Sequence, residues 1–238
     1  MTSERAASPR ARLIRHAQAS WGSADYDCLS ALGVTQAQTL GCWLAAEPEA
    51  TYTQVVRGSL RRHAHTLELI EAAFAAAGRA LPWVRVDRDW NEFDHESVLR
   101  AYAAAHADDP NVGAARAGDH RALRAVLMAA LQGWREGRFD DVASETWSAF
   151  GHRVAAARER IGAEHGTVLV VTSGGAIWRC AQAALALDDQ GLIDAKLSFL
   201  RNTGLCEFER GAERWRMLSW DDVPHLAAPE HEPLHSHF

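Results

Sequence analysis

The chain has 238 residues, 47% of them hydrophobic and 24% charged, which is enough to bury a full core in one large domain. Its formal charge of -6 is modest and its basic residues are scattered, so neither nucleic acid nor a membrane surface is favoured as a partner. The four cysteines show no CxxC pairing and residues 1–12 hold no signal-like apolar run, which argues against a zinc knuckle or disulfide framework and favours a cytoplasmic protein.

The first part of the chain alternates short apolar runs with alanine-rich stretches, the pattern of a mostly parallel sheet covered by helices. In chain order we predict a strand at residues 12–15, a helix at about 35–47, a strand at 54–57, a helix that ends near 77, and a strand at 83–86. Ser59 directly precedes the second helix and is placed to act as its N-cap.

The second part begins with a helical segment, which breaks at residues 108–111 and which we interpret as an insertion of about 98–144 over the functional site. Next we predict a helix at about 144–165, a buried strand at 167–171, a helix that begins at 173–175, and a hairpin of 205–209 with 215–219. The tail, about 224–238, is rich in Pro, His and Glu, and we expect it to be frayed.

Polar residues that could carry chemistry follow the predicted strands, where open α/β sheets place their ligands. His16 comes directly after the first strand, and a neutral imidazole is a competent nucleophile toward phosphorus. The adjacent Arg15 could hold phosphoryl oxygens and disperse their charge. An Arg-His pair alone is more often a surface feature, so the rest of the chain decides.

A series of segments then resembles, in the right order, the motifs of the histidine phosphatase superfamily, the phosphoglycerate mutase-like proteins. Residues 13–18 (LIRHAQ) resemble the LxRHG(E/Q) signature, and residues 27–37 resemble its D-x-L-(S/T)-x-x-G-x-x-Q-A continuation. Residues 58–66 are similar to the S-x-L-x-R-A-x-x-T motif, and residues 91–94 to the segment that carries the general acid. Residues 145–153 are similar to the E-S-x-x-x-F-x-x-R helix, residues 170–175 to V-S-H-G-G, and residues 200–204 to L-x-N-x-G.

The resemblance implies a three-layer α/β/α fold with a mostly parallel central sheet, and a mechanism for the site. His16 would become transiently phosphorylated, Arg15 and Arg62 would hold the phosphoryl oxygens, and Glu92 would protonate the leaving alcohol. Ser173 and Gly174 would complete the phosphate-binding set. The family needs no metal, and the resemblance implies no other cofactor.

The chain departs from the family pattern most clearly at Ser173, where a second histidine is usual. Serine keeps a neutral donor and loses a cation, and without compensation we expect this exchange to lower the rate by about 10- to 100-fold. Smaller departures are Gly58 where serine is usual, His63 where alanine is usual, and Ala17 where glycine is usual.

Other groups could compensate for the missing cation. The N–H groups of Gly174 and Gly175 open a helix and could bind an anion. Four histidines are candidates for a substitute donor: His63, His65, His95 and His152. His95 is the first of these, because it is nearest in sequence to Glu92.

Three functional classes follow from these observations. We favour a phosphomonoesterase that acts on a small phosphorylated metabolite or on a phosphoprotein, because His16, both arginines and Glu92 are all present. A catalytically weak or inactive relative that binds phosphate esters is the alternative, and Ser173 is its best argument. A phosphoglycerate mutase is disfavoured, since its extra substrate-binding segments are not found.

Some features receive a plainer interpretation. Four histidines of the tail could bind a transition metal, but a solvated end is favoured: His225, His231, His235 and His237. The tryptophans, Trp83, Trp90, Trp147 and Trp178 among them, are expected in the core or pocket wall. The oligomeric state stays open, with a dimer as one option.

Overall fold

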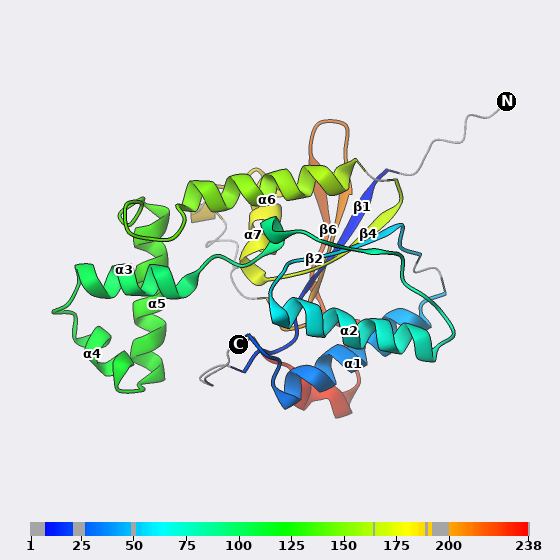
Figure 1. Ribbon diagram of the computed structural model, residues 1–238, viewed down its shortest axis with the longest axis horizontal. Helices are drawn as coiled ribbons and strands as arrows, with labels where there is room; N and C mark the ends of the chain where they lie inside the picture. Colours follow the sequence, from blue (N-terminus) through cyan, green and yellow to red (C-terminus); the bar gives the residue numbers. More distant parts are fainter. Residues whose placement is uncertain are drawn as a thin grey trace. The chain divides into compact units, whose positions relative to one another are not determined.

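The computed structural model describes residues 8–20, 27–48, 51–163, 165–188, 190–191 and 200–237. The chain forms two compact units (Figure 1). The first combines residues 1–92 with 154–238, and the second is Phe93–Arg153. The segment that the sequence suggests as an insertion, residues 98–144, falls within the second unit.

A six-stranded sheet organises the first unit, with the strand order β3-β2-β4-β1-β5-β6. Its strands are β1 (Arg10–Arg15), β2 (Gln54–Arg57), β3 (Val84–Val86), β4 (Thr167–Thr172), β5 (Leu205–Arg210) and β6 (Trp215–Asp222). The first four strands run parallel to one another, and β5 and β6 run antiparallel at one edge. The predicted mostly parallel sheet and its closing hairpin are therefore confirmed.

The register of the three central parallel strands determines where the site lies. Arg15 of β1 is opposite Thr172 of β4, and Arg57 of β2 is opposite Val171. The strands therefore end together, and the residues that follow them leave the same edge of the sheet. In open α/β sheets this carboxyl edge is where ligands bind.

Helices cover both faces of this sheet. They are α1 (Ala31–Ala46), α2 (Arg61–Ala76) and α7 (Gly174–Leu185). Figure 1 shows α1 and α2 on one side of the sheet and α7 on the other, which gives the predicted three layers. The core beneath α1 and α2 joins Leu40, Leu44 and Ile70 to Val55 and Leu169 of the strands.

Helix α1 also packs closely against the loop that follows β1. Its N-cap Ser30 accepts a hydrogen bond from the Gly33 N–H at 3.0 Å, which satisfies one of the first free amides of the helix. A Cβ atom at Gly33 would lie 2.1 Å from the carbonyl oxygen of Gln18. Glycine at this position thus allows the helix to approach the backbone beside the site.

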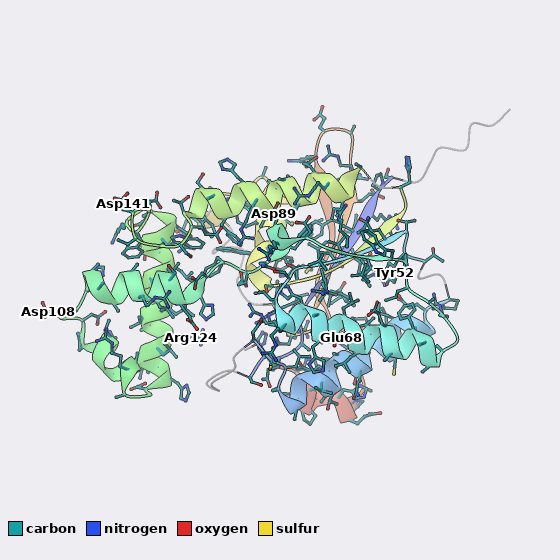
Figure 2. The ribbon with its side chains drawn as sticks, in the orientation of Figure 1. Tyr52, Glu68, Asp89, Asp108, Arg124 and Asp141 are labelled. Carbon is teal, nitrogen blue, oxygen red and sulfur yellow. The ribbon has the colours of Figure 1, made fainter. Side chains whose placement is uncertain are left out.

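The second unit is helical. It contains α3 (His95–Ala105), α4 (Pro110–Arg116), α5 (His120–Arg135) and the first turns of α6 (Trp147–Gly162), whose later turns belong to the first unit. The predicted break at residues 108–111 is confirmed, because Asp109 caps the start of α4. Trp134 and Phe150 form its buried aromatic centre, whereas Asp108, Arg124 and Asp141 are exposed (Figure 2).

The C-terminal segment differs from the expected frayed end. It forms two 3-10 turns, η2 (Pro224–Leu226) and η3 (Pro229–Leu234), and Leu226 is buried. Gln36 of α1 donates from Nε2 to the Leu234 carbonyl at 2.6 Å and to Ser236 Oγ at 2.8 Å. The tail is held because its backbone satisfies a buried glutamine, a contact that composition does not reveal.

The tryptophans divide between the core and the surface. Trp90 is fully buried as expected, whereas Trp83 is 75% exposed, so its predicted place in the core is wrong. Trp83 directly precedes β3, an edge strand in the sheet order, and such positions have fewer neighbours to cover a large side chain. Within the described residues, no helix is long and apolar enough to cross a membrane.

Candidate functional site

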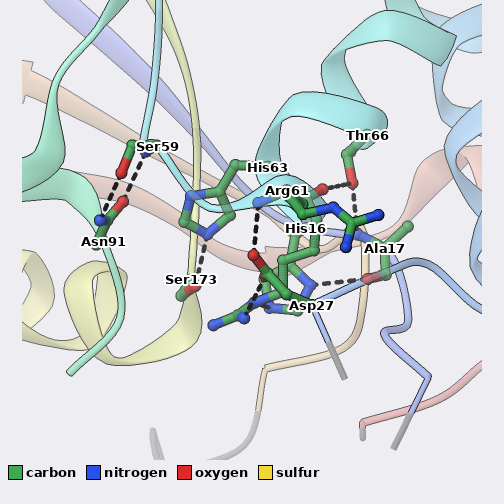
Figure 3. A network of polar contacts seen from close by, with 10 residues as sticks. His16, Ala17, Asp27, Ser59, Arg61, His63, Thr66, Asn91 and Ser173 are labelled. Carbon is green, nitrogen blue, oxygen red and sulfur yellow. Dashed lines mark hydrogen bonds and ion pairs between the residues drawn. The ribbon is translucent and has the colours of Figure 1, made fainter. Parts of the chain in front are cut away.

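The residues with predicted roles follow the ends of the parallel strands at the carboxyl edge of the sheet, and Figure 3 shows His16, His63 and Ser173 near one another. They come from four places in the chain: His16 follows β1, Arg62 and His63 open α2, Glu92 follows the 3-10 turn η1 (Arg88–Trp90), and Ser173 follows β4. All of them belong to the first compact unit.

His16 is held in one tautomer. Its Nδ1 lies 2.7 Å from the Ala17 carbonyl oxygen, and because a carbonyl only accepts, Nδ1 carries the proton. Nε2 accepts a hydrogen bond from Arg62 Nε at 3.2 Å. The lone pair of Nε2 therefore faces the arginine, as required of a nitrogen that would attack an anion bound there.

The surroundings of His16 keep its imidazole neutral. Burial lowers the pKa of His16 well below the usual 6.5, and electrostatic interactions with Arg62, Arg15 and His63 lower this pKa further. Only the hydrogen bond to Ala17 acts in the other direction. A neutral imidazole keeps its lone pair at neutral pH, which nucleophilic chemistry needs.

Arg62 is oriented by Asp27. The Arg62 side chain is only 6% exposed, and its Nη1 lies 2.7 Å from Asp27 Oδ1. Asp27 Oδ2 accepts the Arg61 backbone N–H at 2.7 Å, which ties the carboxylate to the start of α2. Asp27 opens the second matched motif segment, but its role was not predicted from the sequence.

Arg15 and Glu92 meet the start of α7. A Cβ atom at Gly174 would lie 3.7 Å from Arg15 Nε, so the backbone there is close to the guanidinium. Arg15 Nη1 donates to the Leu200 carbonyl. Gly175 donates its N–H to Glu92 Oε2 at 3.1 Å. One of the two amides expected to bind an anion therefore holds the Glu92 carboxylate in this structure.

The turn that leads from β2 into α2 is tied to the segment before Glu92. Ser59 was predicted to cap α2, but Leu60 is the N-cap residue and makes no side-chain cap hydrogen bond. Asn91 Oδ1 instead accepts the Ser59 N–H at 2.7 Å, and Asn91 Nδ2 donates to Ser59 Oγ at 2.9 Å. The prediction that Ser59 caps α2 is wrong, because the side-chain amide of Asn91 binds both the N–H and the hydroxyl of Ser59.

Other polar contacts hold the backbone of the first motif. Asn202 Nδ2 donates to the His16 carbonyl at 3.2 Å, and the Thr203 N–H donates to the Arg15 carbonyl at 3.1 Å. The Ala17 N–H donates to Thr66 Oγ1 at 3.1 Å. Asn202 lies in the last matched motif segment, and this match was the only indication in the sequence that it belongs to the site. No role was predicted for Thr66.

The histidine phosphatase superfamily (branch 1) matches residues 12–223. The chain belongs to this superfamily.

Solved structures share its fold. Bacillus stearothermophilus YhfR is 19% identical over 91% of this chain and 98% of its own, with a TM-score of 0.65. Mycobacterial glucosyl-3-phosphoglycerate phosphatase is 22% identical over 91% and 100%, with a TM-score of 0.61. Phosphoglycerate mutase from Bacillus anthracis is 16% identical over 92% and 96%, also with a TM-score of 0.61. No curated protein matches the chain by sequence.

The positions at which the sequence differs from the motifs given above lie in the same cluster of this superfamily member. Ser173 Oγ is 2.7 Å from His63 Nε2, and both residues are fully buried. The ring of His63 has its centroid 5.6 Å from that of His16. His95 was predicted first as the substitute donor, but His95 begins α3 in the second unit, whereas His63 contacts Ser173 directly.

The tail histidines do not form a metal site in this phosphatase-like chain. His225 is buried, and its Nε2 lies 2.8 Å from Thr203 Oγ1. Burial, and then the neighbouring His231, His235 and Arg201, lower the pKa of His225 to about 3. In the part of the chain that the structure describes, no three His, Cys, Asp or Glu side chains are arranged to hold a metal ion.

Proposed function

We propose that this chain is a phosphomonoesterase that hydrolyses a small phosphorylated metabolite or a phosphoprotein through a phosphohistidine on His16. The observation that carries the proposal is the state of His16: a buried, neutral imidazole with its proton on Nδ1 and its Nε2 lone pair beside Arg62. A ring used only for packing needs neither this tautomer nor a cation at its free nitrogen.

The first step transfers the phosphoryl group to the enzyme. His16 Nε2 attacks phosphorus and forms the P–N bond, while the bond from phosphorus to the ester oxygen breaks. Glu92 acts as the general acid: its carboxyl proton goes to the departing oxygen, and the alcohol leaves. Arg15 and Arg62 hold the phosphoryl oxygens, whose charge they offset as the transition state forms.

The second step returns the free enzyme. A water molecule gives a proton to the Glu92 carboxylate and attacks the phosphorus of phosphohistidine. The P–N bond breaks, inorganic phosphate leaves, and Nε2 recovers its lone pair. Asp27 supports both steps because it fixes the guanidinium of Arg62.

A catalytically weak or inactive relative that binds phosphate esters is the second candidate, and the exchange of a histidine for Ser173 favours it. Such a protein would need the two arginines but not an oriented nucleophile. A mutase would also have to retain the phosphoenzyme and rebind its intermediate. The fold is compatible with either activity, because both a phosphatase and a mutase are among the solved structures that share it.

Hydrolysis of a chromogenic phosphomonoester, measured across acid to neutral pH, tests the proposal. The unaltered protein is expected to release phosphate, and His16→Ala is expected to abolish turnover. His165→Ala, at an exposed histidine of the same compact unit, is the control and should keep the activity. Equal rates for His16→Ala and the unaltered protein would refute a His16 phosphoenzyme, and no turnover in either would favour the binding protein.

A further inference from the structure

Three departures from the family pattern, at positions 58, 63 and 173, lie in contact with one another. A Cβ atom at Gly58 would lie 2.2 Å from His63 Nδ1 and 2.8 Å from His63 Cε1. Real Cβ atoms do not approach ring atoms so closely. The ring of His63 can therefore occupy this position only because residue 58 has no side chain.

The opposite side of the same ring contacts the third position. His63 Nε2 and Ser173 Oγ are 2.7 Å apart, and neither residue is exposed to solvent. The short serine side chain leaves the space that the imidazole fills. The three residues therefore depend on one another: Gly58 leaves space for the imidazole ring of His63, and Ser173 forms a hydrogen bond with that ring.

The direction of the hydrogen bond follows from the two nitrogens of His63. Burial, then Arg62 and Arg57, lower the pKa of His63 well below 6.5, so the ring is neutral and has one N–H. Within the described residues, Nδ1 is buried without a hydrogen-bond partner. An orphaned buried N–H is rarer than an orphaned acceptor, so the proton belongs on Nε2. Nε2–H then donates to Ser173 Oγ.

This direction leaves the hydroxyl proton of Ser173 available for another acceptor. The residues that follow Ser173 face the proposed site: Gly174 lies beside Arg15, and Gly175 binds Glu92. Ser173 thus stands at the start of the backbone segment that meets both groups, with its hydroxyl oxygen already occupied by His63. A phosphoryl oxygen held by the arginines would be an acceptor for the remaining proton.

We infer that His63 is a positioning residue of the active site: it orients the Ser173 hydroxyl so that Ser173 donates to the transferred phosphoryl group. The two residues together take the place of a single donor histidine after β4. The inference rests on the proposed phosphatase activity, and it assigns the exchange at position 173 to a relocated imidazole rather than to a damaged site.

A double-mutant cycle tests whether the two residues act as one unit. Ser173→Ala removes the donor. His63→Leu replaces the imidazole that orients this donor with an apolar side chain of similar volume. Each is expected to lower kcat by roughly 3- to 10-fold with a small change in KM, the loss of one neutral hydrogen bond in the transition state. The double variant should be no slower than either single variant, because both changes remove the same bond.

Rescue separates this role from a structural one. His63→Gln places an amide N–H near the position of Nε2, and it should recover most of the activity lost in His63→Leu. Thermal unfolding of every variant identifies loss of fold, and His165→Ala is again the control. If the fold-decrease in kcat of the double variant equals the product of the two single decreases, the inference is overturned. A folded His63→Leu variant with unchanged kcat would also overturn it.

Reversal of all three positions gives an independent outcome. Ser173→His alone should reduce turnover, because the larger ring must enter a buried space next to His63. The triple change Gly58→Ser, His63→Ala and Ser173→His should restore at least the original rate. A Ser173→His variant that is faster in the unaltered background would show that the site was damaged and not rearranged.

The two proposals fail in different ways. Turnover that survives His16→Ala would refute the phosphohistidine, whereas turnover that depends on His16 but not on His63 would refute only the inference about His63. If the unaltered protein does not hydrolyse esters, the same cycle is measured on its affinity for inorganic phosphate by calorimetry. Coupled losses of affinity would then support the His63–Ser173 unit, and independent losses would overturn it.

Discussion

The His16 imidazole lies beside three groups that oppose its protonation, Arg62, Arg15 and His63, inside a buried site. Its Nδ1 is committed to the Ala17 carbonyl, so only Nε2 is available for attack. Asp27 fixes Arg62, and Asn202 holds the His16 backbone. At the scale of residues, the site is therefore a nucleophile whose protonation state and orientation are set by its immediate neighbours.

Replacement of Arg62 by glutamine should change the pH dependence as well as the rate. The lowered pKa keeps His16 neutral as the pH falls below 6.5, and Arg62 is the largest charge that lowers it. Without this charge the pKa of His16 rises, so the nucleophile is lost at higher pH and the acid limb of kcat/KM moves upward. The rate itself should fall by roughly 100-fold or more, as for other groups that hold transition-state charge.

The profile of kcat/KM against pH measures this shift, with Arg10→Gln as the control. Arg10 is exposed and lies at the start of β1, whereas the site follows the end of that strand. An acid limb that stays in place in Arg62→Gln, while the rate falls, would show that Arg62 does not control the charge of His16.

The motif residues were the predictable part of the site. His16, Arg62, Glu92 and Ser173 were all found in order from the sequence, and the structure brings them to one edge of the sheet. The contact between His63 and Ser173 was not predicted, because the two residues are 110 positions apart and the ring fits only beside a glycine.

At the scale of elements, the sequence predicts strands and helices well where periodicity is regular, and it fails where a long-range side chain intervenes. The strand at 54–57 is confirmed, as are the hairpin of β5 with β6 and the break before α4. Ser59 does not cap α2 because Asn91 binds it, and the tail is not frayed because Gln36 binds its backbone. Both failures come from polar contacts between distant segments, which local pattern does not encode.

Helix α1 offers a test of the close approach beside the first motif. Alanine in place of a helical glycine usually stabilises by roughly 0.5–1 kcal/mol. Gly33→Ala should instead destabilise by about 1–3 kcal/mol, because its Cβ would lie 2.1 Å from the backbone oxygen of Gln18. The free energy of unfolding in urea measures the change.

Gly113→Ala is the matched control for this prediction. Gly113 lies in α4, where a Cβ atom would meet nothing within 4 Å, so the usual stabilisation is expected there. The same sign of change in both variants would contradict the packing of α1 against the loop after β1.

At the scale of the whole molecule, the three-layer fold and its family followed from the order of short motifs along the chain. The division into two compact units did not follow, since no linker composition marks the boundaries, and one boundary falls inside α6. Where a helix continues from one compact unit into the next, the sequence does not mark the boundary, because the hydrogen bonding and periodicity of the helix are uninterrupted.

The buried histidines should make the folded state sensitive to acid. Folding lowers the pKa of His16, His63 and His225, the last to about 3. Below pH 6.5 the unfolded chain therefore binds more protons than the folded protein. The stability that these histidines contribute is fully present above pH 6.5 and decreases as the pH falls below it. Each histidine contributes up to about 1.4 kcal/mol per pH unit.

Urea unfolding between pH 6.5 and about 5.5, above the ordinary glutamate pKa of 4.5, measures this slope. His225→Gln should reduce the slope by the contribution of one histidine, and His152→Gln, at an exposed position, is the control. A free energy of unfolding that does not change across this range would show that the three imidazoles are not buried in neutral form.

The most direct test of the account is to trap the phosphorylated enzyme. The protein is mixed with a phosphomonoester, quenched rapidly under alkaline denaturing conditions that preserve phosphohistidine, and digested for mass spectrometry. We predict one added phosphoryl group on the peptide that contains His16, lost on acid treatment and absent from His16→Ala. Turnover of the ester with no phosphoryl group on His16 during the reaction would contradict the account.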